Sequence, residues 1–311
     1  MDQSTTNFIY FLAIIGGIVF IIWISKILWA LIVLILPNKN YLERYGRDSW
    51  AVVTGGSDGL GLGFCQELAE IGFNICIIAR NKNKMEAALE KLRYLHEERE
   101  IKTKYIVADF VDSPKEGFFA RILEQLQGLD VSILVNNVGV SNIGYFHEIP
   151  EQRLWNEINI NVLPMTFLSY GLVPVLLGRD RRSAIINVSS VAAENPVPFI
   201  STYSATKAYN DCFSQSIQME YADKIDVISL RPMYVESNMS KKEKSCTVAS
   251  SNQCARATLS YLGIDYETNG YCMHRFLSYL TSFMPKPILR CVAESESRQI
   301  MEEEQAGGAN L

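Results

Sequence analysis

The sequence predicts an α/β protein with a single doubly wound parallel sheet and helices on both faces, preceded by an N-terminal transmembrane helix. Three observations support this prediction. Apolar, strand-like segments alternate with helix-like segments between residues 49 and 230, a glycine cluster follows the first of these strands, and a long apolar run precedes them all. At 311 residues, 48% of them hydrophobic, the chain is long enough to bury a sizeable core.

The composition argues against several classes of protein. Twenty-nine basic residues stand against 34 acidic ones, whereas nucleic-acid binders usually carry a basic excess. A charged fraction of 20% is too high for a protein with many membrane spans. Seven cysteines without a C-x-x-C motif and three scattered histidines predict neither a disulfide framework nor a metal site, and they are typical of a reducing compartment.

Residues 1–37 are predicted to form a membrane anchor. From Phe8 to Leu36 the chain is apolar except for two glycines, one serine and Lys26, and roughly 20 such residues cross a bilayer as a helix. A cleaved signal peptide is the main alternative, but the apolar run is too long and no small-residue cleavage site follows it. A buried helix would not be apolar on every face. Because basic residues follow the run and only Asp2 precedes it, we expect a single pass with the body of the protein in the cytosol. The basic residues are Lys26, Lys39, Arg44 and Arg47.

After a polar connector at 38–48, residues 49–292 are predicted to form one domain. The expected strands are Ser49–Thr54, Asn74–Ala79, Lys104–Val107, Ser132–Val135, Ala184–Val188 and Asp226–Leu230. The expected helices are Phe64–Ile71, Lys82–Arg99, Lys115–Leu126, Gln152–Leu177 and Thr202–Tyr221. Apolar strands that alternate with helices predict a parallel sheet covered on both faces.

Three stretches do not follow this alternation. Residues 240–251 are polar and lysine-rich, and they follow the last clear strand, where such sheets carry substrate loops. Residues 276–292 are aromatic and apolar, and they fit either a packed terminal helix pair or a lid or membrane-lying segment beside an apolar substrate. Residues 293–311 are acidic and end in glycines, which predicts a flexible tail.

A glycine-rich loop, Thr54-Gly-Gly-Ser-Asp-Gly-Leu-Gly61, connects the first strand to the first helix. At such a place the backbone amides and the helix dipole favour a pyrophosphate, and glycine lets the phosphates approach closely. A plain turn is the alternative, but the strand before and the helix after favour dinucleotide binding. The candidate residues are Gly55, Ser57, Asp58, Gly59, Leu60 and Gly61.

The end of the second strand indicates which dinucleotide is bound. An acidic residue there would bind the ribose 2′-hydroxyl of NAD, whereas a basic one accommodates the 2′-phosphate of NADP. The chain has no acid at this point but has Arg80, Lys82 and Lys84. A solvated run of charges is the alternative interpretation, but the position favours NADP(H).

Tyr203 and Lys207 form a Tyr-x-x-x-Lys pair, one helical turn apart on one face. A phenol has a pKa near 10 and needs help to act near neutral pH; a neighbouring ammonium and a cationic nicotinamide ring would both favour the phenolate. One such pair among 15 tyrosines could arise by chance. Two further features support a functional role for the pair. Ser190 comes directly after one predicted strand, and Asn136-Asn137-Val138-Gly139 comes directly after another predicted strand.

The chain resembles the short-chain dehydrogenase/reductase family, whose fold is Rossmann-type. The resemblance rests on four motifs in a fixed order, Thr-Gly-x-x-x-Gly-x-Gly, Asn-Asn-x-Gly, a serine and Tyr-x-x-x-Lys, and it extends from about Ser49 to Val292. The chain is most similar to the membrane-anchored branch with 17β-hydroxysteroid dehydrogenase types 3 and 12 and the very-long-chain 3-oxoacyl-CoA reductases. The features that carry this likeness are the apolar N-terminus, Ser57-Asp-Gly-Leu-Gly61, Ala108-Asp109-Phe110, Pro196-Val-Pro198, Thr268-Asn-Gly-Tyr271 and His274.

The resemblance implies roles for the matching residues. Tyr203 would be the general acid of carbonyl reduction, Ser190 would polarise the carbonyl oxygen, and Lys207 would hold the ribose and lower the tyrosine pKa. Asn161 would position a water relay to Lys207, Asp109 would hold the adenine, and Asn137 would support the nicotinamide side. Ser189 and Asn159 remain alternatives to Ser190 and Asn161. The candidate cofactor-binding residues also include Arg80 and Lys84 after the second strand, and the resemblance adds Gly139, Pro232 and Val235.

Two departures from the family pattern matter. Many members have Pro-Gly after the sixth strand, where this chain has Pro232-Met233, a change that the branch shares. We expect the membrane to be that of the endoplasmic reticulum, although the C-terminal Gly-Gly-Ala-Asn-Leu311 lacks a dilysine retrieval signal, which weakens this assignment.

Together these features predict an NADPH-dependent reductase of a lipophilic ketone, with long 3-oxoacyl-CoA in fatty-acid elongation as the leading substrate. A 17-oxosteroid or another lipid ketone is the alternative, because both kinds of substrate need an apolar cleft. A membrane-tethered pseudoenzyme acting as a scaffold is a distant third, disfavoured by the intact Tyr203 and Lys207. We expect a membrane partner, a possible homodimer, and neither metal nor nucleic acid.

Overall fold

The structure is a computed structural model that describes residues 2–35, 40–240 and 242–308. Pro37 and Lys39, which belong to the predicted anchor and connector, lie outside the described residues, as do residues 309–311 of the predicted tail. The chain forms two compact units, residues 1–39 and residues 40–311. Each is described by itself.

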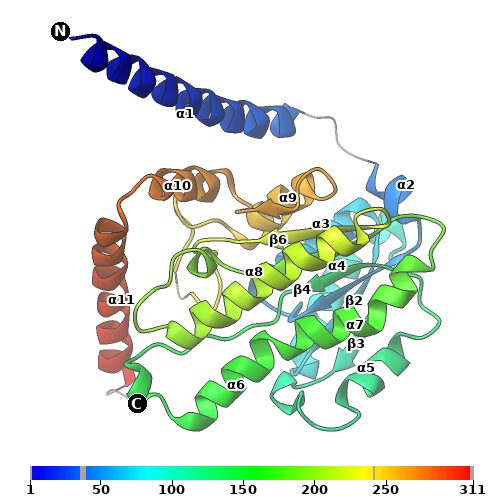
Figure 1. The fold of residues 1–311 in the computed structure, drawn as a ribbon. Helices are drawn as coiled ribbons and strands as arrows, with labels where there is room; N and C mark the ends of the chain where they lie inside the picture. Colours follow the sequence, from blue (N-terminus) through cyan, green and yellow to red (C-terminus); the bar gives the residue numbers. More distant parts are fainter. Residues whose placement is uncertain (1, 36–39, 241, 309–311) are drawn as a thin grey trace. The chain divides into compact units, whose positions relative to one another are not determined.

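The first unit is one helix, α1, from Gln3 to Ile35 (Figure 1). Its stretch Gln3–Ser25 is long and apolar enough to cross a membrane, and none of it is buried. A second stretch, Glu151–Leu177, passes the same test of length and composition, but half of it is buried within the second unit. Because a core helix of a soluble domain has this property too, α1 is the helix that could serve as a membrane anchor.

The second unit is built on a seven-stranded parallel sheet in the order β3-β2-β1-β4-β5-β6-β7. This arrangement confirms the predicted fold class. Four of the strands, β2, β4, β5 and β6, are buried at every position, as expected for a sheet covered on both faces. The strands are β1 Trp50–Thr54, β2 Asn74–Ala79, β3 Thr103–Val107, β4 Val131–Asn136, β5 Ser183–Val188, β6 Ile225–Leu230 and β7 Glu267–Thr268.

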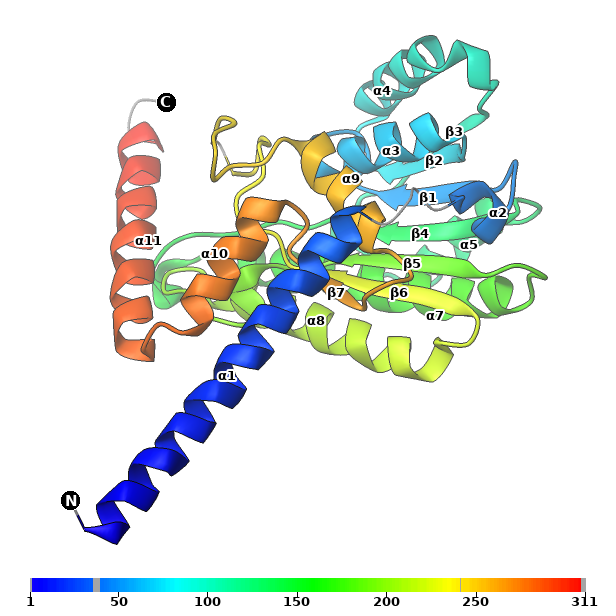
Figure 2. The ribbon, with the colours of Figure 1, turned by 90° about the horizontal axis from the view of Figure 1, so that it is seen from above.

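Helices cover both faces of the sheet (Figure 2). One face carries α3 Gly59–Ile71, α4 Lys82–Leu95 and α9 Ser251–Tyr261, and the other carries α5 Phe118–Leu126, α7 Leu163–Leu177 and α8 Ser201–Tyr221. Helix α6, Glu151–Asn161, packs against α7 and α8. Short 3-10 turns are η1 Glu97–Arg99, η2 Phe110–Asp112, η3 Phe146–Glu148 and η4 Val191–Ala193; the chain ends in α10 Cys272–Ser282 and α11 Lys286–Gly308.

Two predicted segments differ from the structure. The single helix expected at 152–177 is divided into α6 and α7 at Val162, because Pro164 lies in the first turn of α7 and has no N–H to continue a preceding helix. The tail expected at 293–311 continues α11 as far as Gly308, with Ser297 and Met301 buried against the domain. Helix α9 and strand β7 have no counterpart among the predicted elements.

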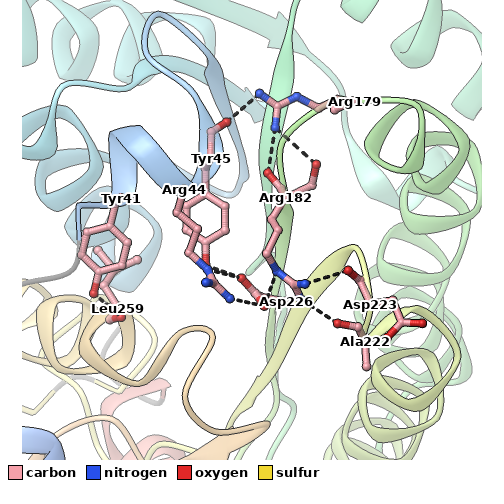
Figure 3. Close-up of polar contacts among 10 residues, drawn as sticks. Tyr41, Arg44, Tyr45, Arg179, Arg182, Ala222, Asp223, Asp226 and Leu259 are labelled. Atoms are coloured by element: carbon pink, nitrogen blue, oxygen red, sulfur yellow. Dashed lines mark hydrogen bonds and ion pairs between the residues drawn. The ribbon is translucent and has the colours of Figure 1, made fainter.

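The helix α2, Tyr41–Tyr45, attaches the start of the second unit to the sheet (Figure 3). The buried Asp226, at the start of β6, accepts hydrogen bonds from Arg44 at 2.7 and 2.9 Å and from the Tyr45 hydroxyl at 2.8 Å. Arg182 adds a bond to the same carboxylate at 2.8 Å, and Arg179 donates to the Tyr45 carbonyl oxygen at 2.6 Å. This network lies at the amino ends of the strands, away from the site described next.

Candidate active site

The residues predicted to act in binding and catalysis gather at the carboxyl ends of the parallel strands. Gly55 follows β1, Asn137 follows β4, Ser190 comes after β5 and Pro232 after β6. The strand order reverses between β1 and β4, and in open α/β sheets the ligand crevice lies at that point. Segments far apart in the sequence therefore meet at one edge.

The glycine-rich loop has a geometry that few other residues would permit. Gly55 and Gly59 have φ values of +65° and +52°, which L side chains rarely adopt. A Cβ on Gly61 would clash with the Gly55 carbonyl oxygen and with the side chain of Asn137. Asp58 caps α3, its Oδ1 accepting from the Gly59 N–H at 2.7 Å. The half-buried Ser57 and Leu60 complete the turn into the helix.

The loop after β6 lies over this turn. Asn238 hydrogen-bonds the Asp58 carboxylate, which also pairs with Lys84 at 3.5 Å. Val235 is buried and pairs as a bridge with Ala249, so both ends of the 233–250 loop are fixed. Between this loop and the N-termini of α3 and α9 lies a cleft of about 450 Å3, lined by residues that include Asp58, Gly59, Ser237, Asn238 and Lys242. Helix N-termini and a lysine are suited to hold a pyrophosphate.

Asn137 and Asp109 have structural hydrogen bonds at their predicted positions. The Asn137 side chain donates to the Thr54 carbonyl oxygen at 2.9 Å, and its backbone N–H donates to the Thr54 hydroxyl at 2.9 Å, which joins the ends of β1 and β4. Asp109 accepts from the Val111 N–H at 3.1 Å and so begins η2. Pro232 is buried and its carbonyl oxygen accepts from Val191, near Ser190.

The three basic residues after β2 differ in their surroundings. Arg80, directly after the strand, is exposed. Lys82 pairs with Glu86 at 3.8 Å, one turn along α4, whereas Lys84 pairs with Asp58 in the glycine loop. Arg80 and Lys84 therefore lie where a phosphate beside that loop could meet them.

Tyr203 and Lys207 lie in the first two turns of α8, beside the ends of β5 and β4. Lys207 is 3% exposed, and its Nζ donates to the Val188 carbonyl oxygen at 2.8 Å and lies 5.6 Å from the centre of the Tyr203 ring. A Cβ on Gly139 would lie 3.3 Å from that Nζ, which places Gly139 against the lysine. The strand ends thus orient the lysine toward the tyrosine.

The structure separates Ser190 from its neighbour Ser189. The Ser189 hydroxyl donates to the Lys207 carbonyl oxygen at 2.7 Å and is buried in that contact. The Ser190 hydroxyl accepts from the Ala192 N–H at 3.2 Å and hydrogen-bonds Tyr203. Ser190 is therefore the serine beside the phenol.

Asn161, at the end of α6, is almost wholly buried and connects three parts of the site. Its Oδ1 accepts from the Val140 N–H at 2.8 Å, and its Nδ2 donates to the Val140 carbonyl oxygen at 2.9 Å and to the Thr206 hydroxyl at 3.0 Å. Asn159 is only half-buried, and its backbone carbonyl accepts from Ser113. Asn161 is thus the asparagine that faces α8.

The acid–base properties of the pair differ from the expectation that Lys207 lowers the tyrosine pKa. Burial raises the pKa of Tyr203, a hydrogen bond to Ser190 lowers it, and the charge of Glu157 raises it. Burial also lowers the pKa of Lys207 to about 8. The protein by itself therefore favours the protonated phenol, which is the form of a proton donor.

Two residues of this site were missed from the sequence. Glu157 is buried on α6, one turn before Asn161, and Thr206 receives the hydrogen bond from Asn161. Glu157 could have been found from its i, i+4 spacing to Asn161 on one helix face. No spacing signals Thr206, because its contact depends on how α6 packs against α8.

Helix α11 lies beside this edge of the sheet (Figures 1 and 2). Glu296 pairs with Lys242 of the loop after β6 at 3.1 Å, and the Arg298 guanidinium lies 5.4 Å from the centre of the Phe199 ring. The apolar segment at 276–292 forms α10 and the start of α11, which agrees with a terminal helix pair, yet Phe276 and Phe283 are exposed. No cluster of potential metal ligands occurs among the described residues.

Comparisons with known proteins give relatives in sequence and a solved structure with the same fold. The chain is 35% identical over 287 residues to very-long-chain 3-oxoacyl-CoA reductase-B of Danio rerio, covering 88% of this chain and 89% of that protein. It is 36% identical to inactive hydroxysteroid dehydrogenase-like protein 1 of Homo sapiens, covering 80% of this chain and 76% of that protein. Its fold matches that of a short-chain dehydrogenase from Sphingobium yanoikuyae in complex with NADPH, with a TM-score of 0.61, 23% identity and coverage of 68% and 84%.

The family assignment rests on a longer match than any single motif. Residues 49–247, from the first strand through the loop after β6, match the short chain dehydrogenase family. This span contains the glycine loop, Ser190, Tyr203 and Lys207 in their expected order. The chain belongs to the short-chain dehydrogenase family of oxidoreductases.

Proposed function

We propose that this protein is an NADPH-dependent reductase of a lipophilic ketone. The observation that carries the proposal is the clustering of Ser190, Tyr203, Lys207 and Asn161 at the carboxyl edge of the sheet, beside the glycine loop. This cluster holds a proton donor, a polarising hydroxyl and a lysine in one buried place, which is what carbonyl reduction requires.

NADPH, when bound, supplies the hydride that the carbonyl carbon accepts. Tyr203 donates its proton to the carbonyl oxygen, and the Ser190 hydroxyl donates a hydrogen bond to the same oxygen as negative charge develops on it. Lys207, whose pKa burial lowers to about 8, would return a proton toward Tyr203 after turnover and would hold the ribose hydroxyls of the bound cofactor. One ketone, one NADPH and one proton give one alcohol and one NADP+.

The residues at the carboxyl ends of the strands fit a dinucleotide. The backbone from Gly55 to Gly61 would hold the pyrophosphate at the N-terminus of α3, and Arg80 with Lys84 would hold the 2′-phosphate. Asp109, which follows β3, would hold the adenine. Gly139, Pro232 and Val235 would lie on the nicotinamide side; Gly139 lies against Lys207, and Pro232 and Val235 are buried after β6.

For the substrate, we favour a long-chain 3-oxoacyl-CoA, as in fatty-acid elongation. Support comes from the relative of Danio rerio, which is named for that reaction and matches nearly the whole chain. A 17-oxosteroid or related lipid ketone is the second candidate, supported by the hydroxysteroid dehydrogenase-like relative. That relative is named inactive, which keeps a pseudoenzyme scaffold as a distant third; the presence of Tyr203 and Lys207 argues for activity.

The test is NADPH oxidation by membranes that carry the full chain, with long-chain 3-oxoacyl-CoA and 17-oxosteroids compared. We expect turnover of the acyl-CoA and a loss of at least about 100-fold in kcat for Tyr203→Phe, because a general acid contributes that much. Tyr209→Phe, two turns along α8 and bonded to Thr166, is the matched control and should keep its activity. Equal rates for wild type and Tyr203→Phe would refute the catalytic assignment. Turnover of steroid alone would refute the acyl-CoA proposal.

We further propose that α1 anchors the protein in the membrane of the endoplasmic reticulum as a single pass, with the catalytic domain in the cytosol. Support comes from the length and exposure of α1 and from Arg44 and Arg47 on its C-terminal side. A glycan acceptor engineered into the C-terminal tail should stay unmodified in cells. Its glycosylation would place the domain in the lumen instead.

A further inference from the structure

One buried carboxyl group beside the catalytic cluster has no part in the proposed reaction. Glu157 lies on α6, one helical turn before Asn161, and has no exposed surface. Residues four apart share one face of a helix, and through Asn161 this face contacts α8, which carries Tyr203 and Lys207. Glu157 thus belongs to the same buried layer as the reacting groups.

The two carboxyl oxygens of Glu157 have different surroundings. Oε1 accepts a hydrogen bond from the Asn142 N–H at 3.0 Å and so holds the loop that follows β4. Oε2 is enclosed and has no hydrogen-bond partner among the described residues. An ionised carboxylate with an unpaired buried oxygen is costly, and burial accordingly raises the pKa of Glu157, against the hydrogen bonds at Asn142. Buried polar atoms without a partner and ionisable groups with a shifted pKa both occur often at functional sites.

Titratable groups occur on each element that packs against α6. Helix α8 carries Tyr203 and Lys207 near its start, and further along it carries Tyr209, Asp211, Cys212, Glu220 and Tyr221. The 3-10 turn η2 carries Asp112, which pairs with Lys115 at 2.8 Å, and α7 carries Tyr170, which is 80% exposed. The pKa of Tyr203 is raised first by burial, is lowered by the Ser190 hydrogen bond, and is raised further by the charge of Glu157. On α6 itself, Glu151 and Arg153 are exposed.

We propose that Glu157 is a positioning residue of this active site, and that it couples the loop after β4 to the acid–base state of Tyr203. The inference rests on the proposed function, in which Tyr203 is the proton donor. An ionised Glu157 opposes formation of the phenolate, so Tyr203 keeps its proton to higher pH and carbonyl reduction is favoured over alcohol oxidation. When Glu157 is protonated at lower pH, this bias disappears.

The test is the pH dependence of kcat/KM for Glu157→Gln in the full chain, with NADPH and whichever of long-chain 3-oxoacyl-CoA or 17-oxosteroid the wild type reduces. Glutamine keeps an oxygen for the Asn142 N–H but removes the charge. In the pH profile of kcat/KM, the decrease at alkaline pH, where Tyr203 loses its proton, should move to lower pH by about one unit. The reason is that the negative charge of Glu157 no longer opposes formation of the Tyr203 phenolate. At lower pH the two profiles should coincide, and the Kd of NADPH should stay unchanged.

Two further variants keep the inference falsifiable. Glu151→Gln makes the same charge change on an exposed residue of the same helix and should leave the alkaline side of the pH profile in place. Glu157→Asp keeps the charge, so the alkaline side of its pH profile should coincide with that of the wild type. If Glu157→Gln fails to fold, Glu157→Asp becomes the test, and a shift of its alkaline side would count against the proposal. A Glu157→Gln profile that overlays the wild type, or falls equally at every pH, would overturn it. Failure of the proposed function would be recognised by a different result, namely that Tyr203→Phe reduces the substrate at the wild-type rate.

Discussion

Asn161 on α6 donates a hydrogen bond to the Thr206 hydroxyl on α8 at 3.0 Å, and through it the two helices that carry the site are joined. Thr206 in turn donates to the Tyr203 carbonyl oxygen at 2.8 Å. The same asparagine holds Val140 of the loop after β4 with two hydrogen bonds. A single buried side chain therefore fixes the catalytic turn of α8 relative to that loop.

Replacing Asn161 by Ala should damage both stability and turnover. The change leaves the Val140 backbone groups and the Thr206 hydroxyl without their partner in a buried place, which should cost about 2 kcal/mol of unfolding free energy. The kcat should fall at least about tenfold, because an error of 1 Å in the reacting geometry is enough for that. Urea unfolding and steady-state kinetics measure the two effects. Asn159→Ala is the matched control and should change neither; equal kinetic losses for both variants would contradict the role given to Asn161.

Arg80→Ala should change the preference between the two dinucleotides. Arg80 is exposed directly after β2, so its removal should cost little stability. Loss of a charged contact to the 2′-phosphate should weaken NADPH binding about tenfold or more and leave NADH binding nearly unchanged. The ratio of the two Kd values, from the fluorescence of the reduced nicotinamide, is the measurement. Lys82→Ala, whose lysine pairs with Glu86, serves as control, and an unchanged ratio for Arg80→Ala would remove the phosphate assignment.

Asp226→Asn should destabilise the second unit. Burial raises the pKa of Asp226, but hydrogen bonds from Arg44, Arg182 and Tyr45 outweigh burial and hold the pKa below its usual value. The carboxylate therefore contributes stability that is complete above the pKa of Asp in the unfolded chain and is lost as the pH falls through the lower folded pKa. Asparagine removes the buried charge that pairs with the half-buried Arg44 and Arg182, which should cost about 2 kcal/mol of unfolding free energy at neutral pH. Because the variant has no carboxyl group to protonate there, it should lose less stability than the wild type below about pH 4.

Denaturant unfolding at several pH values, with the full chain in detergent, measures this effect. Asp130→Asn is the matched control, because Asp130 also binds an arginine, Arg179 at 2.6 Å, but its side chain is 55% exposed. It should cost less than about 1 kcal/mol. Equal losses for the two variants would show that burial of the Asp226 network does not matter.

A homodimer, which is the expectation from the sequence, would have the exposed faces of α7 and α8 available to it, so Tyr170→Asp should separate it. Phe167, Tyr170 and Tyr209 are exposed on these helices, and large exposed apolar surfaces mark protein interfaces. Sedimentation of the detergent-solubilised chain should show a dimer for the wild type and a monomer for the variant. Tyr94→Asp is the control, because Tyr94 is also 80% exposed but lies on α4, on the other face of the sheet. A variant that sediments like the wild type would exclude this interface.

The alternation of apolar strands with helices was enough to predict the sheet, because fully buried parallel strands read as continuous apolar runs. Every predicted strand occurs, within one or two residues of its expected bounds. The errors have local causes. The apolar pattern predicted one helix at 152–177, but Pro164 divides it into two. The acidic segment at 293–308 was expected to be flexible, but it is helical, and Ser297 and Met301 pack against the domain.

The sequence by itself determined the fold class, the apolar N-terminal helix and the candidates Ser190, Tyr203 and Lys207, because these depend on local periodicity and on motifs at fixed spacing. Only the tertiary structure showed that Ser190, rather than Ser189, lies beside Tyr203, and that Glu157 is buried on the helix face that contacts α8. Burial raises the pKa of the Tyr203 phenol, which residue spacing does not indicate either. The physical reason is that hydrogen bonding and desolvation depend on which helix faces pack together, and residue spacing along the chain does not contain that information.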